Sequence, residues 1–147
     1  MLATISSTFV LDIVSAEGNM YSGDAKMVVV PSQSGELGIM PRHAPLLAML
    51  KPGEVTITTR AGEVEFLYVS GGYIEVQPHC VTILADTALR GEEIDEQAAR
   101  ESMKRAEAVV HTARLYIDRD RAQLEVMKAL AQLKVLEHAR RDKRNRL

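Results

Sequence analysis

The first 85 residues show short apolar runs separated by turn-prone residues. Val55, Ile57 and Thr59 alternate with polar neighbours, as expected for a strand with one buried face. Residues 27–30 are continuously apolar, which indicates a strand buried on both faces, and Pro31 is expected to end it. Further β-rich runs lie at 9–14, 64–69, 73–76 and 81–84. Many short strands about ten residues apart predict a β-sandwich.

The pattern changes near residue 86 to the period of a helix. Beyond it the chain has one glycine, Gly91, no proline and 14 of its 18 basic residues, which favours long helices. Apolar side chains then form two stripes: Ala99, Met103, Ala106, Val110 and Ala113, followed by Leu124, Val126, Met127, Leu130, Ala131, Leu133 and Leu136. They predict helices at about 93–113 and 119–141, with a break at 114–117 and Asp118 capping the second helix.

Two helices with a tight connection are expected to fold back as an antiparallel hairpin. We therefore predict an α+β protein in two parts: an antiparallel β-sandwich over residues 1–86, a linker over 87–92 and a helical hairpin over 93–147. Full burial of a Leu or Met side chain stabilises by about 1.5–3 kcal/mol, whereas Ala contributes a fraction of that. Because the helices are rich in alanine, the hairpin is expected to detach more easily than the sandwich unfolds.

Composition narrows the classes of function. The 18 basic and 20 acidic residues nearly cancel, which gives no general argument for binding nucleic acid or lipid. The single cysteine, Cys80, suits a reducing compartment. The first basic residue is Lys26, so neither a secretory signal nor a transit peptide is expected. We expect a soluble cytoplasmic protein, because no apolar run approaches the roughly 20 residues of a membrane span.

Residue patterns that carry catalysis are missing from the sequence. The four histidines are scattered, without the spacing of a zinc site. No phosphate-binding loop and no nucleophile elbow occurs, and residues 70–72 read as a tight turn between strands. These observations favour a binding or regulatory protein without a metal over an enzyme.

Four segments carry a resemblance to a known family. Residues 34–47 (SGELGIMPRHAPLL), 69–76 (VSGGYIEV), 81–88 (VTILADTA) and 12–17 (DIVSAE) resemble, in order and spacing, the epsilon subunits of bacterial rotary ATP synthases. The resemblance extends over essentially the whole chain. It implies a non-catalytic part of the central stalk of a proton-translocating enzyme, peripheral to the cytoplasmic face of the bacterial inner membrane.

The resemblance also implies partners and a motion. The sandwich is expected to bind the gamma subunit and to rest on the membrane-embedded c-ring. The hairpin is expected to move from a compact to an extended form that enters the alpha/beta hexamer and inhibits ATP hydrolysis. The two predicted helices, laid end to end, would reach roughly 66 Å at ~1.5 Å per residue.

Candidate site residues follow from the resemblance. Glu36 and His43 lie in the segment that matches the family's ring-contacting loop; an exposed turn residue and a locally packed ring are the alternative interpretations. The basic tail, Arg140, Arg141, Lys143 and Arg144, suits an acidic patch on the catalytic subunits. The same residues also suit a solvated helix end that matches the helix dipole.

An ATP site known in some family members is incomplete in this sequence. Asp95 and Arg105 match two of its positions, but Ala98 occupies the place of an expected arginine. Lys128 and Gln132 also stand where arginines are expected, and lysine lacks the two-pronged phosphate contact of a guanidinium. We therefore expect weak ATP binding or none. A nucleotide-sensing module and an unrelated adaptor, with a sandwich and a coiled coil, remain the alternatives.

Overall fold

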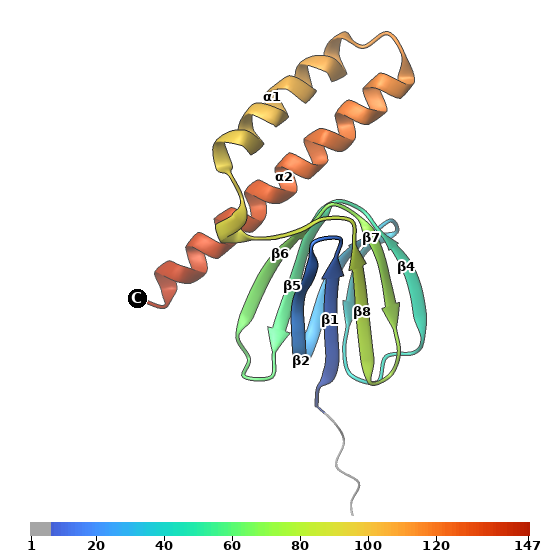
Figure 1. The fold of residues 1–147 in the computed structure, drawn as a ribbon, viewed down its shortest axis with the longest axis vertical. Helices are drawn as coiled ribbons and strands as arrows, with labels where there is room; N and C mark the ends of the chain where they lie inside the picture. Colours follow the sequence, from blue (N-terminus) through green and yellow to red (C-terminus); the bar gives the residue numbers. More distant parts are fainter. Residues whose placement is uncertain (1–6) are drawn as a thin grey trace, which may run out of the picture.

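A computed structural model describes residues 7–147, which form a β-sandwich with a two-helix hairpin at one end (Figure 1). The strands are β1 (Phe9–Ser15), β2 (Gly18–Ser32), β3 (Gly35–Ile39), β4 (Leu46–Leu50), β5 (Gly53–Thr59), β6 (Val64–Val69), β7 (Gly72–Val76), β8 (Cys80–Ala85) and β9 (Ala88–Arg90). A 3-10 turn, η1 (Gly91–Glu93), leads to α1 (Glu96–Thr112) and α2 (Tyr116–Asn145). The predicted sandwich followed by a helical hairpin is confirmed.

The long strand β2 joins the two layers of the sandwich. Its first half pairs with β1, and its second half pairs with β5 and β3. The pairing of β2 with β5 is irregular near Ala25, where the main partner of β2 changes from β1 to β5. Such a bulge bends the strand and lets it pass from one layer to the other. The strand pairs are antiparallel, except that β1 and β8 run parallel.

Alternating side chains from both layers fill the core of the sandwich. Leu11, Ile13, Ile57, Ile74 and Ile83 are fully buried in it. These residues come from four different strands, and branched aliphatic side chains pack well on pleated surfaces. The predicted core of aliphatic residues is thus present.

Two details of the predicted strands and linker were wrong. Pro31 does not end β2, because a proline loses only the donor and its carbonyl still accepts a hydrogen bond from the Lys51 amide at 2.9 Å. The expected linker contains β9, which pairs with β6, and the 3-10 turn η1. The Thr87 amide donates to Ser70 Oγ at 2.9 Å, and the Arg90 guanidinium donates to the Met20 carbonyl at 2.7 Å. This segment is therefore attached to the sandwich.

The helices also differ from the predicted bounds. Asp95 is the N-cap of α1, and its carboxylate accepts a hydrogen bond from the Ala98 amide at 3.0 Å. Asp118 was wrongly predicted as the cap of α2, since that helix starts at Tyr116 after Leu115. The hairpin connection is therefore shorter than expected.

Only one helix of the hairpin packs firmly on the sandwich. The α2 helix lies against β5, β6 and η1, whereas α1 packs along α2 on the outer side (Figure 1). None of the helices within residues 7–147 is both long enough and apolar enough to cross a membrane.

Candidate interaction surfaces

One outer face of the sandwich is apolar and exposed. Leu47 and Met49 on β4 are 71% and 53% exposed, and Tyr73 on β7 and Leu84 on β8 are 48% and 54% exposed. The register aligns Met49, Tyr73 and Leu84 in one row across three strands. We call this set, together with Leu47, the apolar sheet face. Contiguous exposed apolar side chains mark a surface that binds a partner.

The predicted ring-contacting residues lie on one segment of the chain. Glu36 is exposed on β3, and His43 is half-buried in the loop that follows. His43 Nδ1 lies 2.8 Å from the carbonyl oxygen of the next residue, Ala44. The Arg42 amide donates to the Pro78 carbonyl at 2.9 Å, which ties the loop to the β7–β8 turn. The loop is therefore held in a defined shape, with Met40 60% exposed beside His43.

The hairpin docks on the sandwich through a small apolar cluster. Tyr68, Ile94, Ala131 and Val135 are buried in it, and Phe66, Leu89 and Leu136 pack at its edge. Burial raises the pKa of the Tyr68 phenol, and a hydrogen bond with Gln132 on α2 partly offsets this effect. From the segment before α1 the cluster includes Leu89 of β9 and Ile94, and it includes no residue of α1 itself.

A polar contact lies beside this docking cluster. Glu54 on β5 has a side chain that is only 6% exposed, and its Oε2 accepts a hydrogen bond from His138 Nδ1 at 2.7 Å. Lys134 Nζ lies 3.9 Å from the other carboxylate oxygen. The ring of Phe66 packs against His138 with centroids 4.9 Å apart. The docked hairpin therefore covers the carboxyl group of Glu54 and supplies the side chains that contact it.

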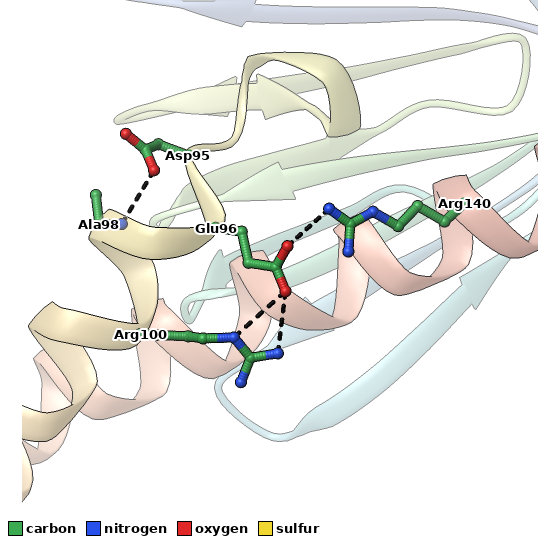
Figure 2. A network of polar contacts seen from close by, with 5 residues as sticks. All are labelled: Asp95, Glu96, Ala98, Arg100 and Arg140. Carbon is green, nitrogen blue, oxygen red and sulfur yellow. Dashed lines mark hydrogen bonds and ion pairs between the residues drawn. The ribbon is translucent and has the colours of Figure 1, made fainter.

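A second polar network joins the two helices (Figure 2). Glu96, in the first turn of α1, contacts Arg100 at 3.0 Å on the same helix and Arg140 on α2 at 2.7 Å. Hydrogen bonds from Arg140 and Arg100 lower the pKa of the Glu96 carboxyl. Because the two arginine side chains are exposed and Glu96 is partly exposed, water screens the attraction. Glu96 orients the start of α1 against the end of α2.

The predicted basic tail is partly engaged in ion pairs. Arg140 holds Glu96, and Arg141 pairs with Glu137 at 2.8 Å. Lys143 and Arg144 line, with Arg140, a groove of about 920 Å³ between the helices, whose apolar wall includes Leu130 and Leu133. The structure thus brings most of the tail to one groove, whose polar lining also includes Glu96 and Glu137.

The residues at the positions of the family's nucleotide site do not contact one another in any described interaction, and most of them have other partners. Asp95 caps α1, as Figure 2 shows, and Arg105 is exposed beside a shallow cavity that also contains Arg121. Lys128 pairs with Glu125 at 3.2 Å, and Gln132 hydrogen-bonds to Tyr68. Within residues 7–147, no group of His, Cys, Asp and Glu side chains is arranged to hold a metal ion.

The architecture defines a class of protein: a strand-built anchor that carries a docked helical arm. Two family models match this division. The ATP synthase Delta/Epsilon chain beta-sandwich domain matches residues 8–91, and the ATP synthase Delta/Epsilon chain long alpha-helix domain matches residues 92–137. The chain belongs to the ATP synthase delta/epsilon chain family. The first model ends directly after β9, so the family includes this strand in the sandwich.

Similar proteins cover nearly the whole chain. An ATP synthase epsilon chain of Alkalilimnicola ehrlichii is 53% identical over 92% of this chain and 96% of its own length. The epsilon chain of Thioalkalivibrio sulfidiphilus is 48% identical over 95% of this chain and 100% of its own. These relatives confirm the resemblance to epsilon subunits, and they exclude the unrelated adaptor.

Solved structures share the fold at low sequence identity. A chain of the Euglena gracilis mitochondrial ATP synthase, in a structure of OSCP, F1 and c-ring, aligns with a TM-score of 0.78 at 19% identity, covering 93% of this chain and 84% of that one. A chain from the central stalk and c-ring structure of the Tetrahymena thermophila enzyme aligns with a TM-score of 0.61 at 13% identity, covering 90% and 99%. Both show the same fold, sandwich and helices together.

Sequence reasoning missed two of these surfaces. Apolar residues at both odd and even positions of 46–50 are the signal for the apolar sheet face, because a strand with one solvated face alternates. No comparable signal marks Glu54 and His138, which are 84 positions apart. Their contact depends on how the hairpin docks.

Proposed function

We propose that this chain couples the rotor of an ATP synthase to its c-ring and restrains ATP hydrolysis through its helical arm. As a member of its family, it is a non-catalytic subunit of the complex. The observation that carries the regulatory part is the way the hairpin docks, since a single helix contacts the sandwich through a small cluster. Such an arm detaches without unfolding its anchor.

The apolar sheet face is the surface for the gamma subunit in this proposal. Its exposed Leu47, Met49, Tyr73 and Leu84 need a partner to leave water, and burying apolar area drives stable association. The loop with Glu36 and His43 is then assigned to the polar loops of the c-ring. Glu36→Ala and His43→Ala are expected to weaken coupling of hydrolysis to proton transport while the protein stays folded. Wild-type coupling in the double variant removes this assignment.

The arm acts on the catalytic hexamer after it extends. Its two helices have 17 and 30 residues, and 30 residues alone span roughly 45 Å at ~1.5 Å per residue. The apolar and basic groove opens when the helices separate, and Lys143 and Arg144 are placed to meet an acidic partner surface. The complex would place the chain at the cytoplasmic face of the bacterial inner membrane, held there by its partners.

For nucleotide we propose weak binding or none. Exposed Ala98 offers no guanidinium, Lys128 pairs with Glu125, and Gln132 faces Tyr68 in the docking cluster. Calorimetric titration of the full chain with ATP tests this proposal. Micromolar affinity contradicts it and favours the nucleotide-sensing module.

The decisive experiment removes the arm from the assembled enzyme. The chain is ended after Arg90, so that β9 stays paired with β6, and ATP hydrolysis is compared with that of the full-length complex. We expect faster hydrolysis with the truncated subunit still bound to the complex. Unchanged hydrolysis with the truncated subunit bound contradicts the regulatory role.

A further inference from the structure

The docked arm covers one carboxyl group of the sandwich whose described side-chain partners lie only on the arm. Glu54 is on β5, yet its side chain is 6% exposed, and both side chains that contact its carboxyl oxygens, His138 and Lys134, come from α2. The other residues of β5 carry no ionisable side chain. The charge on Glu54 is therefore balanced across the interface between anchor and arm.

Neighbouring elements offer no substitute partner. On β6, Phe66 and Tyr68 face α2, and the Tyr68 phenol contacts Gln132. Glu65 lies on the opposite face of β6, where it acts on Tyr21. In η1, the Glu93 carboxylate accepts a hydrogen bond from the Arg90 amide at 2.7 Å. Both side-chain contacts described for the Glu54 carboxyl therefore come from α2.

On α2 itself, the acidic neighbours of His138 have partners of their own. Glu137 is paired with Arg141 at 2.8 Å, and Asp142 with Arg146 at 3.2 Å. His138 is thus left to Glu54, with Phe66 packed against its ring.

A buried carboxylate responds asymmetrically to changes in its surroundings. Removing one partner of a buried pair is costly, because an uncompensated charge stays in a poorly solvated place, whereas replacing both partners by apolar groups is often neutral. In this chain the carboxylate can regain its hydration without unfolding of the sandwich, because undocking of α2 exposes Glu54 to water. Loss of the histidine therefore acts on the docking equilibrium rather than on the fold of the sandwich.

We propose that Glu54 and His138 form a latch that sets how readily the arm leaves the sandwich, with Lys134 as a weaker second contact. The apolar cluster around Val135 provides the attraction between arm and sandwich. The latch adjusts the equilibrium between the docked and the undocked arm. Docking is favoured while the imidazole is placed to bond the carboxylate. The inference rests on the proposed function only for its consequence in the complex, because docking is a property of the chain itself.

Docking is measured on the full chain with two spin labels. Labels are attached after Glu63→Cys in the exposed β5–β6 turn and Tyr116→Cys at the exposed hairpin tip, in a Cys80→Ser background. The distribution of distances gives the undocked fraction. We expect His138→Ala to raise the ratio of undocked to docked arm by about tenfold or more, since a buried charge loses its main partner.

The double variant separates a latch from simple loss of packing. Glu54→Leu combined with His138→Leu removes both polar partners. We expect the ratio of undocked to docked arm in this double variant to be about tenfold lower than in His138→Ala. Glu137→Gln is the matched control, because it removes a carboxylate from an exposed pair on the same helix, and it is expected to leave the distances unchanged. If His138→Ala leaves the undocked fraction at the wild-type level, or if the double variant is as undocked as His138→Ala, the latch is wrong.

In the assembled enzyme the same variants test the consequence. A released arm has more access to the catalytic hexamer, so His138→Ala is expected to lower ATP hydrolysis severalfold relative to wild type. If His138→Ala undocks the arm in the labelled chain but leaves hydrolysis unchanged, the latch stands and the proposed inhibition fails. The two measurements thus fail independently.

Discussion

The sandwich and the hairpin bury different kinds of side chain. Leu11, Ile13, Ile57 and Ile83 in the sandwich are completely buried. In α1 the buried residues are Ala99 and Ala106, and in α2 they are alanines and one valine, Val135. Alanine removes little apolar area from water. The sandwich is therefore expected to be the more stable part, and the hairpin is held by contacts that a partner can replace.

The sandwich and the hairpin also differ in how many neighbouring elements support each strand or helix. Each buried strand of the sandwich has hydrogen-bonded neighbours and a facing layer, whereas α1 has α2 as its main support. Local opening starts where buried apolar contacts are few. Native-state hydrogen exchange is thus expected to show weaker protection in α1 than in β1 or β8. Equal protection of both regions contradicts the comparison.

The largest expected effect comes from the core of the sandwich. Ile83→Ala removes three buried carbon atoms at a site with no exposed surface, and we expect a loss of about 2–5 kcal/mol in the free energy of unfolding. Denaturant titration measures it. Leu84→Ala is the control, because this neighbour on the same strand is 54% exposed. A similar loss for both variants would mean that the core does not determine the stability of the sandwich.

The next effect concerns close packing where the arm is attached. A Cβ added to Gly91 meets the Cβ of Ala139 on α2 at 2.6 Å, so Gly91→Ala must push α2 away, at a cost of about 1–3 kcal/mol. The undocked fraction is measured with the label pair described above. Ala139→Gly in the same chain removes the obstructing methyl group and should restore part of the docking. No rescue would indicate that the glycine acts in another way.

A smaller effect is expected from the docking cluster. Val135 is fully buried between α2 and the sandwich, and Val135→Ala removes two methyl groups, worth about 1.6 kcal/mol at ~0.8 kcal/mol per buried carbon. We expect more undocked arm and an unchanged free energy of unfolding for the sandwich. Val109 on α1 is 41% exposed, so Val109→Ala should change neither the undocked fraction nor the free energy of unfolding. A destabilised sandwich in Val135→Ala would show that anchor and arm share one core.

The smallest effect belongs to Glu96. Its lowered pKa, caused by Arg140 and Arg100, means that the contact stabilises the hairpin above the ordinary pKa of a glutamate. This stabilisation is lost as the pH falls through the lowered value. The protection of amides in the first turns of α1, taken relative to the intrinsic exchange rate at each pH, should therefore fall on acidification below about pH 4.5 in the wild type. In Glu96→Gln the exchange should already be faster at neutral pH and lack this step; an identical pH profile in both proteins contradicts the role of Glu96.

Errors in the sequence-based boundaries have a common cause. Pro31 and Asp118 were interpreted by local preference, but strand pairing continues β2 through Pro31 and α2 begins before Asp118. Residues 88–90 carry little local signal and become β9 because an open edge of β6 lies beside them. Tertiary contacts override weak local preferences in such segments.

From its sequence alone, the chain could be assigned its two periods and its family, but not the residue at which the sandwich ends. A period of two requires a sheet and a period near 3.6 requires helices, because these spacings follow from backbone geometry. Only the tertiary structure decided that α2 rather than α1 docks, that the apolar sheet face remains exposed and that His138 meets Glu54. Both helices have apolar stripes, and a contact across 84 positions depends on the relative placement of two bodies, which local spacing does not encode.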